Sequence, residues 1–136
     1  MSEEIGIEIR VNHSFQETLE LIQGALKDEG FGVLTSIDVQ ATMKEKLDID
    51  FRPYTILGAC NPQLAHRVLT QDAVAGLLLP CNITVEADTD ISSIVRIANP
   101  EVILAIGSLE QNKEVSAVAH EARLRLERVA EAMLAS

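Results

Sequence analysis

Two short segments constrain the fold of this chain more than any other feature, because each ends an apolar run at an Asn-Pro pair. They are ILGACNP at residues 56–62 and IVRIANP at residues 94–100. Asn is favoured at the N-cap of a helix, and Pro is favoured at the first helical position. An apolar run that stops at such a pair predicts a strand followed directly by a helix. We interpret the similarity of these two segments as one type of strand-to-helix turn used twice, not as a duplicated domain.

Apolar spacing along the rest of the chain predicts five strands and five helices. The expected strands span residues 5–11, 31–37, 54–60, 76–87 and 93–98. Pro80 interrupts the fourth, which indicates a sheet edge or a bulge, and a turn at Thr89-Asp90 makes the last two a hairpin. The expected helices span residues 14–29, 38–47, 61–69, 99–107 and 110–134. Ser14 and Glu17 have the spacing of a capping box, and Gly30 is a left-handed helix stop.

The last helix carries one apolar seam, with apolar residues that step by three or four. Its members are Val115, Val118, Ala122, Leu126, Val129 and Met133. Such a seam fits either of two uses, covering the sheet or joining two subunits. With 136 residues and 47% hydrophobic content, the chain is predicted to form a single α+β domain over residues 1–136.

The charge of the chain excludes several partners. The formal net charge is −10, and the 11 basic residues are scattered among 21 acidic ones. Phosphate backbones and anionic membrane surfaces repel such a protein, so we expect no nucleic-acid and no membrane binding. The acidic N-terminus lacks a secretory signal, and no apolar run is long enough to span a bilayer. We therefore expect a cytoplasmic protein in which both cysteines are free thiols.

Three ordered blocks in the middle of the chain resemble a known family. They are GFGVLTSIDVQATMKEKL, the RPY-ILGACNP-LAH block from Arg52 to His66, and GLLLPCN from Gly76 to Asn82. The sequence is similar here to the domain-of-unknown-function family 302. The resemblance implies a compact domain with a curved antiparallel sheet, similar in type to the TATA-binding-protein-like fold, and a homodimer. It implies no reaction, cofactor or catalytic residue.

Chemistry is expected in the same stretch. Cys60 would lie beside the helix that Asn61 caps, where free amides and the helix dipole lower the pKa of a thiol. Alternatively, Cys60 is a small buried residue at the end of an apolar strand. Cys81 follows Pro80 and either faces a site or packs in the core. His66 lies one and a half turns into the helix, so an exposed helical histidine is favoured over a contact with Cys60.

Arg52 and Tyr54 are the remaining candidate residues. Arg52 can bind an anionic ligand, or it can pair with Asp48 or Asp50 beside it. Tyr54 can anchor the same ligand through its hydroxyl, or it can be a core aromatic. Cys60, His66 and Cys81 together can ligate a soft metal, but their spacing matches no recognised zinc motif, so no metal is predicted. The chain also lacks P-loop, GxGxxG, GxSxG, HExxH and CxxC motifs.

These features support three hypotheses of different classes. The first is a small-molecule binding or sensing module, with a site formed by Arg52, Tyr54, Cys60 and their neighbours. The second is a thiol-dependent redox or sulfur-handling protein that uses Cys60, with Cys81 as a resolving partner. The third is an interaction protein whose dimer surface is the function, motivated by the long C-terminal helix.

Overall fold

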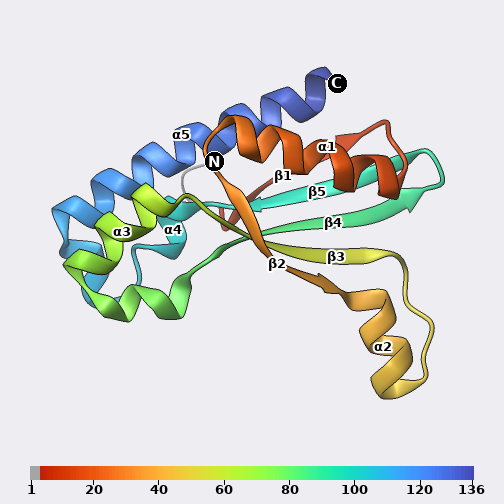
Figure 1. Ribbon diagram of the computed structural model, residues 1–136, viewed down its shortest axis with the longest axis horizontal. Helices are drawn as coiled ribbons and strands as arrows, with labels where there is room; N and C mark the ends of the chain where they lie inside the picture. The colour runs from red at the N-terminus through yellow and green to blue at the C-terminus, as the bar shows by residue number, and fades with distance from the viewer. Residues whose placement is uncertain (1–3) are drawn as a thin grey trace.

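Five strands form one antiparallel sheet in the computed structural model, which describes residues 4–136 (Figure 1). The strand order is β1-β5-β4-β3-β2. The strands are β1 (Gly6–Val11), β2 (Gly32–Asp38), β3 (Tyr54–Cys60), β4 (Cys81–Thr89) and β5 (Ser92–Ala98). The predicted α+β class with a curved antiparallel sheet and a long C-terminal helix is confirmed.

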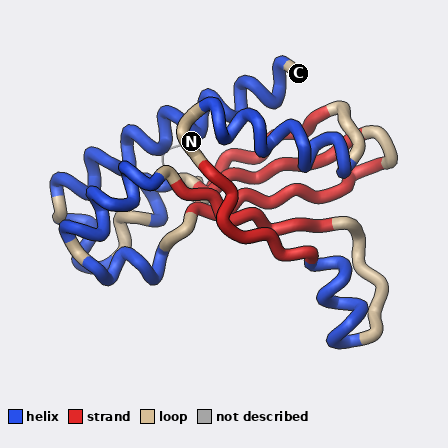
Figure 2. The backbone as a smooth tube through the Cα atoms, viewed as in Figure 1, coloured by secondary structure: helices blue, strands red, loops and turns tan. Residues whose placement is uncertain are grey.

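Helices α1 (Phe15–Asp28) and α5 (Lys113–Ala135) cover one face of this sheet. The shorter helices are α2 (Val39–Leu47), α3 (Pro62–Gln71) and α4 (Pro100–Ile103), with short 3-10 helices η1 (Ala73–Leu78) and η2 (Gly107–Gln111). Helices α1 and α5 pack against each other and against the strands, whereas α2 projects beyond the sheet edge (Figures 1 and 2). Odd-numbered residues of the strands, such as Leu57, Val85 and Val95, are buried beneath the helices.

Local signals set the ends of α1 as predicted. Ser14 accepts a hydrogen bond from the Glu17 amide, and the Glu17 side chain returns to Ser14, which completes the capping box. Gly30 has φ +84°, the left-handed conformation that ends the helix with little strain. A Cβ at Gly30 would also lie only 2.9 Å from Nδ2 of Asn61.

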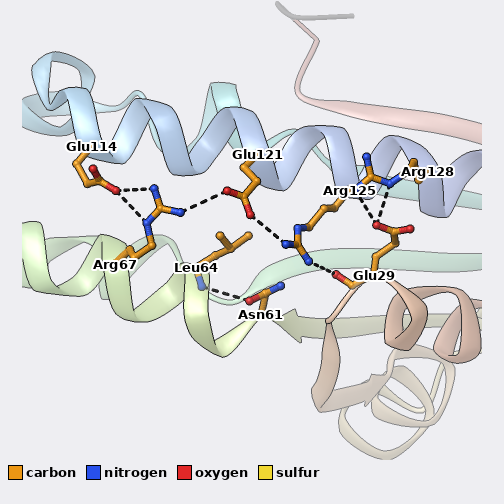
Figure 3. Close-up of polar contacts among 8 residues, drawn as sticks. All are labelled: Glu29, Asn61, Leu64, Arg67, Glu114, Glu121, Arg125 and Arg128. Carbon is orange, nitrogen blue, oxygen red and sulfur yellow. Dashed lines mark hydrogen bonds and ion pairs between the residues drawn. The ribbon is translucent and has the colours of Figure 1, made fainter.

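The apolar seam of the long helix α5 covers the sheet. Of the two predicted uses of the seam, covering the sheet or joining two subunits, the structure therefore shows the first. All six seam residues are buried within the chain, together with Ala119 and Ala130. A polar ladder ties the neighbouring face of α5 to α3 and to the end of α1 (Figure 3). In it, Arg67 bonds Glu114 and Glu121, and Arg125 bonds Glu121 and the carbonyl of Glu29.

Several predicted boundaries are wrong. Residues 76–78, predicted to begin the fourth strand, instead belong to η1, because the Asp72 side chain caps that turn through the Val74 amide. Strand β4 therefore starts only at Cys81, after Pro80, and its register with β3 is regular, so Pro80 causes no bulge. Helix α4 ends at Ile103 instead of residue 107. Helix α5 starts at Lys113 instead of residue 110, since Asn112 supplies the cap.

The sheet edge at β2 continues into a segment without a core, residues 32–51, which we call the arm. It consists of β2, α2 and the loop that leads to β3. Asp38 caps α2 through the Ala41 amide, as predicted. None of the arm's residues is buried, and several large apolar side chains are exposed: Leu34, Ile37, Leu47 and Ile49. The arm is therefore held to the domain chiefly by the pairing of β2 with β3.

Candidate functional site

Even-numbered residues of β1, β3, β4 and β5 lie on the face opposite α1 and α5, which we call the open face, and the bulge in β2 adds Thr35 and Ile37 to it. Because side chains alternate along a strand, cross-strand partners there form rows. One row consists of Glu8, Arg96, Thr84, Ile56 and Ile37, and the next consists of Arg10, Ile94, Glu86 and Tyr54. Charged groups therefore meet in the middle of the sheet, on strands far apart in sequence.

Glu86 lies at the centre of these charges. Its side chain is only 8% exposed, and its carboxylate accepts hydrogen bonds from Nη1 of Arg96 and Nε of Arg52. Arg96 also donates from Nε to Glu8 at 2.7 Å. Burial acts to raise the pKa of Glu86, but the hydrogen bonds and charges of Arg96 and Arg52 outweigh it and hold the pKa below its usual value. The two arginines and two glutamates neutralise one another.

Arg52 and Tyr54 lie close together on the open face. The Arg52 guanidinium lies 4.6 Å from the ring centre of Phe51 and 5.7 Å from that of Tyr54. Its ionic partner is Glu86, 34 positions away, and not the adjacent Asp48 or Asp50. Those two aspartates lie beside Lys44 instead. Tyr54 is half-buried and is not a core aromatic.

A groove of about 530 Å³ opens beside these charges. Its walls include Tyr54, Thr84 and Arg96 from the open face, and Ile5 and Ile103 from flanking segments. A volume in this range suits a small organic molecule. The buried Oγ1 of Thr84 has no hydrogen-bond partner among the described residues. An unpaired buried hydroxyl is unfavourable, and a ligand that bonds it would recover that free energy.

Cys60 and Cys81 line a different space, between the sheet and the helices. It is an apolar cavity of about 30 Å³, also lined by Phe31, Leu64 and Val118. That volume suits no more than a water-sized guest. Cys81 pairs with Ala59 in the sheet, next to Cys60, and both cysteines are free thiols. The structure thus brings the two cysteines together, but not around a metabolite-sized pocket.

Burial makes both thiols poor nucleophiles. It raises the pKa of Cys60, the opposite of the direction expected from the adjacent helix start. It raises the pKa of Cys81 to about 11, with a smaller contribution from Cys60. Desolvation disfavours a thiolate here, because the cavity walls are apolar and supply no cation.

The two remaining candidates, Asn61 and His66, lie at the N-cap of α3 and within α3. Asn61 is buried and caps α3 through the Leu64 amide at 3.2 Å, as predicted. His66 is exposed on α3 beside Arg67 and Glu114, and it does not line the cysteine cavity. Within residues 4–136, no group of three or more His, Cys, Asp or Glu side chains is arranged to hold a metal ion.

The predicted residues therefore do not form one site: Arg52 and Tyr54 lie together, the two cysteines and Asn61 line the cavity, and His66 lies apart from both groups. Tyr54 and Cys60 lie at opposite ends of β3, and the six steps between them along a strand span about 20 Å. Sequence reasoning missed Glu8, Thr84, Glu86 and Arg96. A signal for them was available, because Asn82, Thr84 and Glu86 are polar at every second position of a strand that otherwise reads as core.

A two-layer α+β domain with a groove on its open sheet face is the class of protein that these features define. The chain belongs to the family described as domain of unknown function DUF302, whose model matches residues 7–133. It is similar to the crystal structure of an uncharacterised conserved DUF302 protein from Bacillus stearothermophilus, with a TM-score of 0.83 and 28% identity. The alignment covers 95% of this chain and 98% of that one. The search of curated proteins finds no match. Across the described part of the chain, no helix is both long and apolar enough to cross a membrane.

Proposed function

We propose that this protein is a small-molecule binding module whose ligand occupies the groove on the open face. The observation that carries the proposal is the unpaired hydroxyl of Thr84, buried in the wall of a groove of about 530 Å³. The site keeps Tyr54 from the sequence hypothesis, whereas Arg52 does not line the groove and contributes only through its bond to Glu86. It does not include Cys60, which lies at the far end of β3.

The charges around the groove favour an uncharged ligand. Arg96 is bonded to both Glu8 and Glu86, and Arg52 is bonded to Glu86, so a charged ligand would have to displace an existing ion pair. Thr84 has no such partner, so a neutral donor or acceptor could bond its buried Oγ1 without breaking an ion pair once the groove wall shifts enough to expose it. Ile5 and Ile103 offer apolar surface for the rest of the molecule. We therefore propose an uncharged compound with a polar group over Thr84.

A thermal-shift screen tests this proposal. Compounds are grouped as uncharged, anionic or cationic and are tested on the wild type and on Thr84→Val. We expect stabilisation of the wild type by members of the uncharged group, and a reduced shift in the variant. Thr18→Val is a matched control, because the buried Thr18 hydroxyl already bonds the Ser14 carbonyl at 2.8 Å and lies on α1. No stabilising compound in any group would count against the proposal.

The thiol-dependent alternative has less support. Both thiols line an apolar cavity, and burial raises both pKa values, so neither is an activated nucleophile. The long helix α5 suggested the interaction alternative, but the exposed arm now supports it instead. The seam of α5 is buried within the chain, but the arm is not. We therefore also propose that the protein works as a homodimer, as the family resemblance implies.

A further inference from the structure

The groove on the open face is lined by three neutral polar side chains, and each can both donate and accept a hydrogen bond. They are the hydroxyls of Tyr54 and Thr84 and the carboxamide of Asn82. The charged side chains of Glu8 and Arg96, which also line the groove, are already bonded to each other. Recognition of an uncharged ligand therefore depends on the neutral groups, and Asn82 is the most exposed of the three.

Asn82 contributes its side chain to no contact that holds the fold together. Among residues 4–136, its carboxamide has no hydrogen-bond partner. The residue lies on β4, the central strand of the sheet, between β3 and β5. Asparagine is disfavoured in strands, where β-branched residues fit best. The fold therefore gains nothing from a carboxamide at this position, whereas a ligand in the groove would gain two hydrogen-bonding groups.

The sheet surface between Asn82 and the edge strand β1 carries only small side chains in this row. Gly6 of β1 pairs with Ala98 of β5, and both line the groove. Asn82 lies across from Ala98, because the adjacent residues Ile83 and Ile97 are paired. A glycine and an alanine leave the backbone almost uncovered, so a flat molecule can lie against it with one edge toward Asn82.

The opposite side of Asn82 is closed. On that side Asn82 pairs with Gly58 of β3. A Cβ at Gly58 would clash with Oγ1 of Thr35 and would lie 2.7 Å from Cγ of Pro80, so these two side chains occupy that part of the sheet surface. The open space beside Asn82 therefore extends toward β5 and β1.

We propose that Asn82 determines the specificity of this groove, and that the ligand is a planar uncharged compound with an N–H group next to a carbonyl or a ring nitrogen. Lactams, amides and nucleobases belong to this class. The inference rests on the proposed binding function. A carboxamide presents a donor and an acceptor side by side and pairs with such an edge through two hydrogen bonds. Thr84 lies two positions along β4 on the same face, about 7 Å away, which one ring can span.

Other ligand classes fit the groove less well. A puckered sugar ring makes fewer close contacts with a flat surface than a planar ring does. The carboxylates of Glu4 and Glu8 line the groove and repel an anion, whereas the guanidinium of Arg96 repels a cation. A planar and uncharged ring avoids both penalties.

The test is the affinity of a small set of probes for the full chain, measured by ligand-observed NMR titration. Uracil and 2-pyridone have an N–H group next to a carbonyl, and in 1,3-dimethyluracil and 1-methyl-2-pyridone a methyl group blocks that donor. Glucose and sorbitol represent uncharged compounds that are not planar. We expect the unmethylated rings to bind about tenfold more tightly than their methylated counterparts, and also more tightly than glucose and sorbitol.

A matched pair of variants tests the role of Asn82. Asn82→Val removes the carboxamide and places a β-branched residue in the central strand. Asn12→Val makes the same change at an exposed asparagine that does not line the groove. We expect Asn82→Val to weaken the binding of uracil and 2-pyridone about tenfold without lowering the thermal midpoint of the ligand-free protein. Asn12→Val should leave binding unchanged.

The outcomes separate this inference from the proposed function. Equal or tighter binding of the methylated rings, unchanged binding in Asn82→Val, or a lowered midpoint of that variant would overturn the role of Asn82. Binding of glucose or sorbitol in place of the planar rings, weakened in Thr84→Val, would overturn the inference and leave the proposed function standing. No binding by any probe would also overturn the inference, and the wider thermal-shift screen then decides whether the proposed function falls with it.

Discussion

The buried carboxylate of Glu86 accepts a hydrogen bond from Nη1 of Arg96 on the neighbouring strand. Arg52 binds the other carboxylate oxygen from the opposite side. A charge this buried is tolerated only because it is paired, and its partners stay half exposed to water. The charged side chains at the centre of the open face are therefore all paired with one another. The groove beside them contains a buried and unpaired neutral group, the hydroxyl of Thr84.

Replacing Glu86 with Gln should destabilise the protein by about 1–3 kcal/mol, because two arginines lose their shared carboxylate. The loss stays moderate since both guanidinium groups reach solvent. Urea denaturation measures it as a shift in midpoint at constant slope. Glu8→Gln is the control, as the Glu8 side chain is 64% exposed and its loss should change the free energy of unfolding by less than about 1 kcal/mol. Equal effects would show that burial of Glu86 is unimportant.

The ion pairs of Glu86 also predict that the stability of the folded protein falls in acid. The pKa of Glu86 is lower in the folded protein than its ordinary value of 4.5, so the unfolded chain binds the proton more readily. The stabilisation from Glu86 is therefore complete above about pH 4.5 and is lost as the pH falls through the lowered folded pKa. The free energy of unfolding measured against pH should fall less steeply in Glu86→Gln than in the wild type over this window. Identical slopes would contradict the assignment.

Thr84→Val should stabilise the ligand-free protein by about 1–2 kcal/mol, because a methyl group replaces a buried hydroxyl without a partner. Thermal and urea unfolding both report this change. Thr18→Val should have the opposite sign, since the Thr18 hydroxyl is already bonded. A stabilised variant that also loses its response to ligand would tie the unpaired hydroxyl to binding, whereas a destabilised Thr84→Val would mean that the hydroxyl has a partner.

Alkylation of each cysteine against pH, followed by mass spectrometry on the native protein, should find both thiols slow near neutral pH. Burial raises both pKa values, and that of Cys81 reaches about 11. Both thiols should react quickly once the protein is unfolded in urea. Rapid reaction of native Cys60 at neutral pH would instead revive the thiol-dependent hypothesis.

Leu126→Ala should destabilise the protein by about 2–5 kcal/mol, since Leu126 is fully buried in the seam of α5. Leu124 on the same helix is 40% exposed, so Leu124→Ala is the matched control and should cost much less. Chemical denaturation separates the two. A neutral Leu126→Ala would place this seam outside the core.

Local signals predicted much of the fold, because they act between near neighbours. The capping box at Ser14, the Asn61 cap and the α5 seam depend on spacing within a few residues. Residues 76–79 misled the prediction, since an apolar run of that length suits a strand or a helical turn equally well.

The candidate site was only partly predictable for a physical reason. Arg52 and Tyr54 were recognised from the block around residue 52, but their partner Glu86 depends on which strands become neighbours. Strand order is a long-range property, and so is the absence of a partner for Thr84. Period-two alternation in β4 indicates a polar face, but no local pattern tells which charges meet across it.

The most direct test of the account is chemical-shift mapping by NMR on the full chain, titrated with mixtures of uncharged metabolites such as sugars, polyols, nucleobases and amides. If the ligand occupies the groove, a binding compound should shift the amides of Asn82, Thr84 and Arg96 on the open face and leave those of Cys60 and Cys81 unchanged. Binding that shifts only the amides around the cysteine cavity, or no binding by any mixture, would contradict it.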